Sequence, residues 1–115
     1  MNIQTSNPTQ VSGPPVTFKL QDKGSAHVSM TLIIAGATVL RHEETYAGSL
    51  VRTLDLAKGN YECTYVEIAF KTGALGPTYD SIVTINGSTA VKAKGSIAAG
   101  SDSDYGFAKF TLVVA

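Results

Sequence analysis

Apolar and polar residues alternate over short stretches of this chain, and turn residues separate the stretches. In residues 26–35, every second position is apolar: Val28, Met30, Leu32 and Ile34. Successive side chains of a strand point to opposite faces, so this alternation predicts a strand with one buried face. No stretch shows the sustained period of an amphipathic helix. We therefore expect an all-β fold.

The same pattern divides the rest of the chain into strand-length stretches. Strands are predicted at 16–20, 38–42, 50–56, 61–71, 79–85 and 105–114, and one more follows Asn86-Gly87. That dipeptide lies between two apolar runs and predicts a type I′ hairpin, because both central positions of that turn need positive φ. About eight strands, with a turn roughly every 8 to 12 residues, favour an antiparallel two-sheet β-sandwich of jelly-roll or immunoglobulin-like topology.

The length of 115 residues matches a single domain. Residues 1–14 are polar, and Asn7-Pro8 and Gly13-Pro14-Pro15 oppose helix, so this segment is predicted to be a flexible N-terminal arm. Residues 15–115 are predicted to form one β-sandwich domain. The chain has one cysteine and no tryptophan, so it lacks the Cys and Trp signature of true immunoglobulin domains.

Charge is balanced along the chain. Nine lysine and arginine residues face nine aspartate and glutamate residues, and neither sign forms a long run. The sequence therefore predicts neither nucleic acid nor a membrane surface as a partner. The first residues lack the basic and apolar regions of a secretory signal, so we expect a cytoplasmic location and leave secretion open.

The inventory of catalytic groups is small. Only His27 and His42 offer a base near neutral pH, and His42 lies in a charged stretch beside Glu43 and Glu44. Neighbouring residues of a strand point to opposite faces, so the two glutamates do not converge on one site. Cys63 falls in a predicted strand, where a buried and inert thiol is expected. An enzyme with an unrecognised site is therefore a lesser alternative.

Residues 100–106 combine two aspartates and two serines between glycines, in the order Gly-Ser-Asp-Ser-Asp-Tyr-Gly. Hard oxygens in one loop are the ligands that Ca²⁺ prefers, which makes Asp102 and Asp104 candidate calcium ligands. The same residue types also build ordinary turns between strands, and two carboxylates are a minority of the about six to eight oxygens that Ca²⁺ takes.

This loop, followed by a terminal apolar strand, resembles the calcium loop of the small soluble calcium-dependent bacterial lectins. The resemblance implies a β-sandwich that binds sugars through paired calcium ions, with Asp102 and Asp104 among the ligands. Three residues depart from the family, since Ala98, Gly106 and Phe107 stand where it has oxygen ligands. The chain also ends in Val-Val-Ala instead of the family's glycine. The resemblance thus implies a divergent lectin that has lost its two-calcium site.

We expect a non-enzymatic binding module, because a rigid sandwich with variable loops and no convergent catalytic set is a common scaffold for recognition. The expected partner is a protein or a carbohydrate; no cofactor is expected, with calcium as the alternative. The predicted contact residues are the apolar or aromatic ones nearest the predicted loops: Tyr46, Leu75, Pro77, Tyr79 and Tyr105.

Self-association is a further expectation. Edge strands of antiparallel sandwiches pair between chains unless charge or proline protects them. The sequence is therefore compatible with a homo-oligomer joined through edge strands, with Lys92 and Lys94 protecting one edge.

Overall fold

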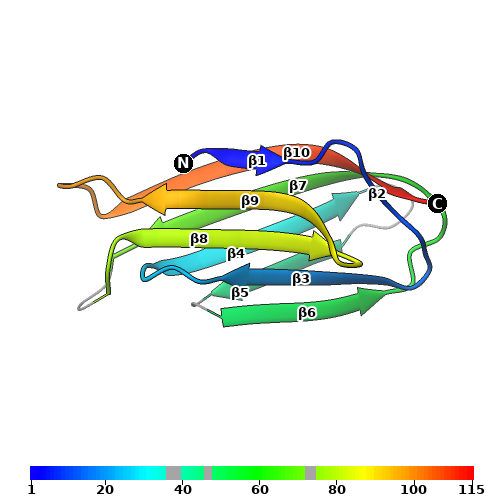
Figure 1. The fold of residues 1–115 in the computed structure, drawn as a ribbon, viewed down its shortest axis with the longest axis horizontal. Coiled ribbons are helices and arrows are strands. Elements are labelled where there is room, and N and C mark those ends of the chain that lie inside the picture. Colours follow the sequence, from blue (N-terminus) through cyan, green and yellow to red (C-terminus); the bar gives the residue numbers. More distant parts are fainter. Residues whose placement is uncertain (36–39, 46–47, 72–74) are drawn as a thin grey trace.

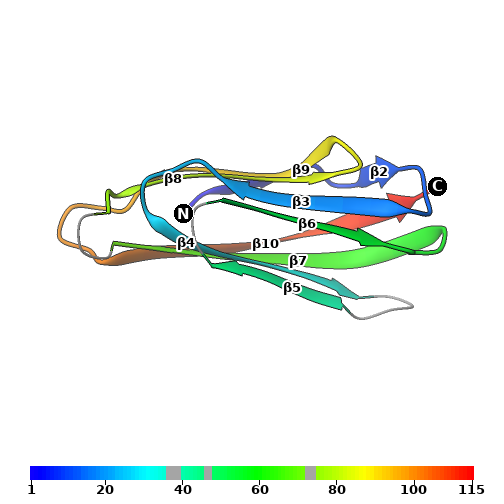
Figure 2. The ribbon, with the colours of Figure 1, turned by 90° about the horizontal axis from the view of Figure 1, so that it is seen from below.

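The structure is a computed structural model that describes residues 1–35, 40–45, 48–71 and 75–115. These residues form ten strands in two sheets of five, packed face to face into an elongated sandwich (Figure 1 and Figure 2). The prediction of an all-β, two-sheet sandwich is confirmed. Within the described ranges, no helix is long and apolar enough to cross a membrane.

The two sheets are named sheet A and sheet B. Sheet A contains, in spatial order, β1 (Ile3–Thr5), β9 (Ser88–Ser96), β8 (Thr78–Ile85), β3 (Val16–Asp22) and β6 (Gly48–Leu54). Sheet B contains β2 (Thr9–Val11), β10 (Ser103–Val114), β7 (Gly59–Phe70), β4 (His27–Ala35) and β5 (Leu40–Thr45). The eight predicted strands correspond to β3 through β10.

Most connections cross from one sheet to the other. From β3 onward, only β4 to β5 and β8 to β9 join neighbouring strands of one sheet. The strands β3 to β10 follow the order of a circularly permuted jelly roll. This order favours the jelly-roll alternative over the immunoglobulin-like one. All pairs are antiparallel except β2 with β10.

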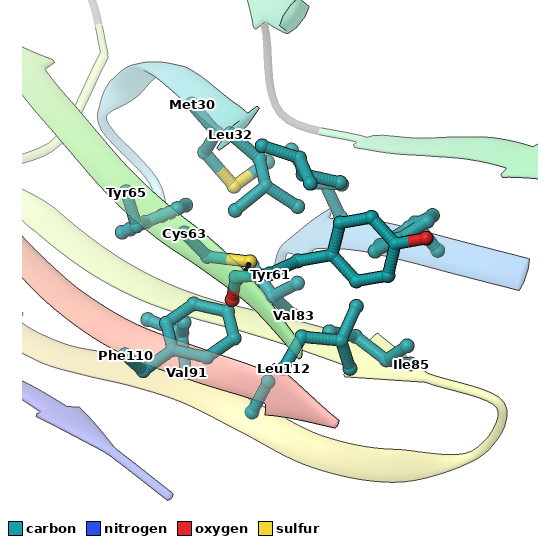
Figure 3. Close-up of a cluster of buried hydrophobic side chains, with 14 of the residues drawn as sticks. Met30, Leu32, Tyr61, Cys63, Tyr65, Val83, Ile85, Val91, Phe110 and Leu112 are labelled. Atoms are coloured by element: carbon teal, nitrogen blue, oxygen red, sulfur yellow. Dashed lines mark hydrogen bonds between the residues drawn. The ribbon is translucent and has the colours of Figure 1, made fainter. Parts of the chain in front are cut away.

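The inward faces of the two sheets supply an apolar core. The alternating residues of β4 are all fully buried, as their spacing predicts. Figure 3 shows part of the core, where side chains from both sheets meet: Met30, Leu32, Tyr61, Cys63, Tyr65, Val83, Ile85, Val91, Phe110 and Leu112. Burying one such large apolar side chain stabilises the fold by about 1.5 to 3 kcal/mol.

β7, in the middle of sheet B, carries bulky side chains on both faces. Its core-facing side chains are all buried: Tyr61, Cys63, Tyr65, Glu67 and Ala69. Val66, Ile68 and Phe70 are turned to the outside, and Ile68 is 43% exposed. The strand therefore buries a carboxyl group and exposes an isoleucine.

Residues 1–14 differ from the flexible arm expected from the sequence. Residues 3–5 pair with β9 in sheet A, and residues 9–11 pair with the end of β10 in sheet B. Proline opposes helix but is compatible with extended chain, and the isolated apolar residues Ile3 and Val11 pack against the core. Because β1 pairs with residues 91–93, Lys92 does not lie on an open edge strand.

Gly106 of β10 makes room for this N-terminal segment. A Cβ atom at residue 106 would lie 3.0 Å from Ile3 Cδ1 and 3.2 Å from Met1 Cβ. Glycine thus lets the start of the chain pack closely on β10. The terminal ammonium of Met1 then reaches Asp104 Oδ1 at 3.0 Å.

The hairpin at Asn86-Gly87 is confirmed. Asn86 has a φ of 49° and Gly87 a φ of 82°, the positive values that a type I′ turn needs. The Asn86 side chain also ties this turn to the approach to β3. Its Oδ1 accepts from the Thr17 N–H at 2.7 Å, and its Nδ2 donates to the Ser12 carbonyl at 2.7 Å.

We expect Asn86→Ala to destabilise the protein by about 2 kcal/mol, because it removes these hydrogen bonds and places alanine at positive φ. Urea-induced unfolding measures the change. The matched control is Asn60→Ala on β7, an exposed position where a change below about 0.5 kcal/mol is expected. Equal effects of the two substitutions would contradict the anchoring role of Asn86.

Candidate functional site

The outer faces of the two sheets differ in chemistry. On sheet A, polar side chains at β1 and β9 line a shallow hollow of about 210 Å³: Asn2, Gln4, Lys92 and Lys94. Of the five exposed large hydrophobic side chains in the described residues, three lie on the outer face of sheet B. Sheet B is therefore the side with a candidate apolar contact surface.

This surface, here called the aromatic face, consists of Tyr105 and Phe107 on β10 with Val66, Ile68 and Phe70 on β7. Tyr105 is 72% exposed and Phe107 is 68% exposed. In the sheet register, Tyr105 lies opposite Ile68, and Phe107 lies opposite Val66. Residues two apart on a strand are separated by about 7 Å, so the two exposed rings stand side by side along β10.

One end of the aromatic face is formed by Phe70 and His27. Their ring centroids are 4.6 Å apart and their planes are inclined by 29°, which is a stacked arrangement. His27 lies opposite Phe70 in the pairing of β4 with β7. The outward position of His27 agrees with the alternation predicted for this strand, and the contact adds a fourth aromatic ring to the face.

The five predicted contact residues lie in different environments. Tyr105 is exposed, but it lies within β10 and not in a loop. Leu75 and Pro77 are exposed in the connection between β7 and β8. Tyr79 packs in the core at 4% exposure, so its ring presents no surface to a partner. Tyr46 lies outside the described residues.

Sequence reasoning misses Phe107 and Ile68, because both lie in long apolar stretches typical of core strands. One signal was available for Phe107. It follows Tyr105 by two residues and therefore shares its face of the strand. Which of the two faces is buried, however, depends on the neighbouring strands.

Asp102 and Asp104 have different surroundings. Asp102 is exposed, and its backbone carbonyl accepts from the Lys71 N–H at 2.9 Å. The Asp104 carboxylate accepts from the Met1 ammonium at Oδ1 and from the Tyr79 hydroxyl at Oδ2, the latter at 2.9 Å. Within the described ranges, no group of three or more His, Cys, Asp or Glu side chains is arranged to hold a metal. Calcium binding by the two aspartates stays an untested alternative.

The contacts of Asp104 shift two pKa values. Desolvation is the largest influence on Asp104 and acts to raise its pKa, but the hydrogen bonds from Met1 and Tyr79 outweigh it, and the net pKa is lowered. Burial, followed by the hydrogen bond to Asp104, raises the pKa of Tyr79 to about 12. The carboxylate is thus ionised and the phenol protonated at neutral pH.

Calcium is expected to leave the melting temperature unchanged, because both Asp104 oxygens already accept hydrogen bonds from protein groups. Thermal unfolding in excess chelator and in millimolar calcium measures this. An upward shift of several degrees that Asp102→Ala removes would instead establish a calcium site in the loop.

A second unusual group is Glu67, whose carboxyl is fully buried between the sheets. Its Oε1 accepts from the Tyr65 hydroxyl at 2.5 Å, and its Oε2 accepts from Ser81 Oγ at 2.8 Å. Ser81 Oγ also lies 3.5 Å from Asp22 Oδ1. Because Tyr65 is on β7 and Ser81 is on β8, the carboxyl group links sheet B to sheet A.

Burial raises the pKa of Glu67 to about 7. Desolvation is the largest cause; the hydrogen bonds from Tyr65 and Ser81 lower the pKa, and the charges of Asp22 and Asp104 raise it again. The folded protein therefore keeps a proton on Glu67 between pH 4.5, the ordinary value, and about 7. A protonated Glu67 can donate to Ser81, which in turn can donate to Asp22.

Glu67 holds its proton more tightly in the folded protein than in the unfolded chain, because its pKa is higher when it is folded. Its contribution to the free energy of unfolding is therefore greatest below pH 4.5 and is lost as the pH rises through about 7. Relative to Glu67→Gln, the wild-type protein is expected to lose on the order of 3 kcal/mol of unfolding free energy across this range. Urea unfolding at pH values below 4.5 and above 7 measures the difference. Glu62→Gln, an exposed change on the same strand, is the control and should keep the wild-type pH dependence; if Glu67→Gln keeps it too, Glu67 is not the titrating group.

The other candidate catalytic residues lie in different strands. His42 lies in β5 opposite Leu32, and its side chain is outside the described part of the structure. Cys63 is buried, and desolvation raises the pKa of its thiol to about 12, so it is protonated at neutral pH. A second surface hollow, of about 510 Å³ near the chain end, is lined by Gln10, Val11, Ser12, Asn86, Ser88 and Ala115.

Comparisons with protein-family models, with curated proteins and with solved structures found no match for this chain. Its class therefore rests on its own geometry. The fold and the surface define a two-sheet β-sandwich with an exposed aromatic face on sheet B.

Proposed function

We propose that this chain is a non-enzymatic binding module that binds carbohydrate chains on the aromatic face. The observation that carries the proposal is the exposure of Tyr105 and Phe107, at 72% and 68%, side by side on one strand. Keeping large apolar side chains in water costs free energy, and contiguous exposed patches of this kind mark interaction sites.

The size of the aromatic face favours a narrow ligand over a large protein surface. An aromatic side chain has about 150 to 250 Å² of surface that a partner can cover. At the exposures of Tyr105 and Phe107, the two rings together present roughly 300 Å² of accessible surface. A stable protein–protein interface buries about 800 Å² on each partner. The sugar rings of a carbohydrate chain have flat C–H faces, and successive sugars can stack on adjacent aromatic rings.

Polar groups beside the rings can bond to sugar hydroxyls. Lys109 is exposed two residues beyond Phe107 on the same face of β10, opposite Thr64. Ser29 lies next to Ile68 on the neighbouring strand β4. A flat apolar platform flanked by a few donors and acceptors suits the two-sided polarity of a sugar ring.

The proposal is non-enzymatic because the described candidate groups are separated by the fold. His27 stacks on Phe70 at the outer surface, Cys63 lies in the core, and Glu67 is hydrogen-bonded between the sheets. None of the three lines either of the two surface hollows described above.

The proposed binding mode differs from that of the calcium-dependent lectins that the acidic loop resembles. It uses aromatic rings on a sheet and needs no metal. The divergent-lectin alternative is supported by the resemblance of residues 100–106 to the calcium loop, and a response of sugar binding to calcium would favour it.

Tyr105→Ala and Phe107→Ala are each expected to weaken polysaccharide binding about fivefold, because a stacked ring contributes about 1 kcal/mol. The double substitution should abolish it. Depletion of the protein from solution by insoluble cellulose and chitin, and retardation in gels that contain soluble polysaccharides, measure the effect.

Val51→Ala is the matched control, since Val51 is 51% exposed on β6 of the opposite sheet. All three side chains are exposed, so thermal unfolding should be nearly unchanged in each variant. The proposal fails if the wild-type protein binds no polysaccharide in the panel, or if Val51→Ala weakens binding as much as the changes on the aromatic face.

A further inference from the structure

β10 is an edge strand over most of its length. β7 pairs with its twelve residues on one side, whereas β2 pairs only with residues 112–114 on the other. β1 pairs with β9 in the opposite sheet. In the described part of the chain, residues 103–111 therefore have no strand partner on the side away from β7. Figure 1 shows β10 along one side of the sandwich.

Two hydrogen bonds show which backbone groups point to this open side. The Thr111 N–H donates to Asn7 Oδ1 at 3.0 Å, and the Tyr105 N–H donates to Asp104 Oδ1 at 2.9 Å. Both acceptors are side chains outside β7. The N–H and C=O groups of alternate residues point to the same side of a strand, so this side belongs to the odd-numbered residues of β10.

Phe107 and Lys109 lie between these two positions and share their orientation. Their N–H and C=O groups have no hydrogen-bond partner within the described residues. A row of free backbone donors and acceptors on an extended strand is complementary to the backbone of another extended strand.

We infer that this open edge of β10 pairs with the same edge of a second copy of the chain. The two strands run antiparallel about a two-fold axis at Phe107, which places the two Phe107 residues opposite each other and Tyr105 opposite Lys109. About six backbone hydrogen bonds close the pair, two for each hydrogen-bonded pair of residues. In the pair, the Tyr105 N–H donates to the Lys109 carbonyl of the second copy and no longer to the Asp104 carboxylate.

The edge is complementary to itself in this register. The two Phe107 rings form a cross-strand aromatic pair, and each Lys109 ammonium lies beside the ring of Tyr105 from the other copy, a favourable cation and aromatic contact. On the inward side, Gly106 lies directly opposite Ala108 of the second copy, and these small residues leave room for close approach. The formal net charge of zero adds no long-range repulsion between copies.

The two edge strands of sheet A, β6 and β1, are less suited to pairing. On β6, the Arg52 guanidinium donates to the Val51 carbonyl at 3.0 Å and covers a backbone acceptor of that edge strand. β1 is only three residues long. The open stretch of β10 is longer and carries exposed aromatic side chains.

The pairing would make one continuous sheet from the two copies of sheet B. The aromatic faces then lie on the same side, and Tyr105 and Phe107 of both copies form one longer platform. The inference rests on backbone geometry and is independent of the ligand, so dimer formation and polysaccharide binding can fail separately.

The first experiment measures molar mass in solution without any ligand, over a wide range of protein concentration. The wild-type protein should rise from 12.0 kDa to about twice that mass as the concentration increases. Phe107→Lys, which puts like charges opposite each other, should stay monomeric, whereas the control Val51→Lys on β6 should dimerise as the wild type does. Mixing Phe107→Lys with Phe107→Glu should restore the dimer.

The second experiment tests the register by oxidation of introduced cysteines. Phe107→Cys should cross-link to itself, because the Cα atoms of a hydrogen-bonded pair lie about 5.5 Å apart. Tyr105→Cys should not cross-link to itself, but it should cross-link to Lys109→Cys when the two variants are mixed. The native Cys63 is buried and serves as the internal background.

A wild-type protein that stays monomeric at every concentration overturns the inference. Dimers that persist in Phe107→Lys would show that the copies do not pair through this edge. Cross-linking of Tyr105→Cys to itself would show that the register is wrong. Capture of a peptide from another protein on the β10 edge of a monomer would assign the edge to a different partner and would also overturn it.

Discussion

The pairing of β7 with β10 on one side and with β4 on the other decides which side chains of sheet B face the core and which face water. It turns Tyr65 and Glu67 toward the core and Ile68 toward water. The same register then places Tyr105 and Phe107 on the outer face. A shift of one residue would exchange the two faces of β7 and would expose its core tyrosines. The burial of these large side chains therefore outweighs the cost of placing one carboxyl group inside.

That cost is reduced by keeping Glu67 protonated and hydrogen-bonded. A buried polar group without partners is expensive, whereas one that bonds to Tyr65 and Ser81 keeps most of the hydrogen-bond energy it had in water. Because Ser81 belongs to the opposite sheet, the same bonds also fix how the two sheets meet. The carboxyl group thus couples sheet packing to pH.

The N-terminal segment closes one side of the sandwich only in part. Residues 3–5 pair with β9, and residues 9–11 pair with the end of β10. Gly106 has no side chain, and this leaves space for Ile3 to pack closely on β10. Among the described residues, this switch between sheets leaves the middle of β10 without a strand partner on the side away from β7, next to the exposed rings of Tyr105 and Phe107. Both surfaces proposed for recognition, the aromatic face and the open edge, therefore include β10 and lie on sheet B, whereas the sequence predicts contacts in the loops.

Local structure can be predicted from the sequence alone. The alternation of β4, the positive-φ turn at Asn86 and the number of longer strands follow from periods and turn residues that act within a few positions. The places of the N-terminal segment, of Tyr79 and of Phe107 cannot be predicted in this way. Isolated apolar residues at the N-terminus carry no detectable period, and a strand with apolar side chains on both faces gives no sign of which face is buried. Pairing between strands far apart in the chain decides that face, so only the tertiary structure could separate core rings from surface rings.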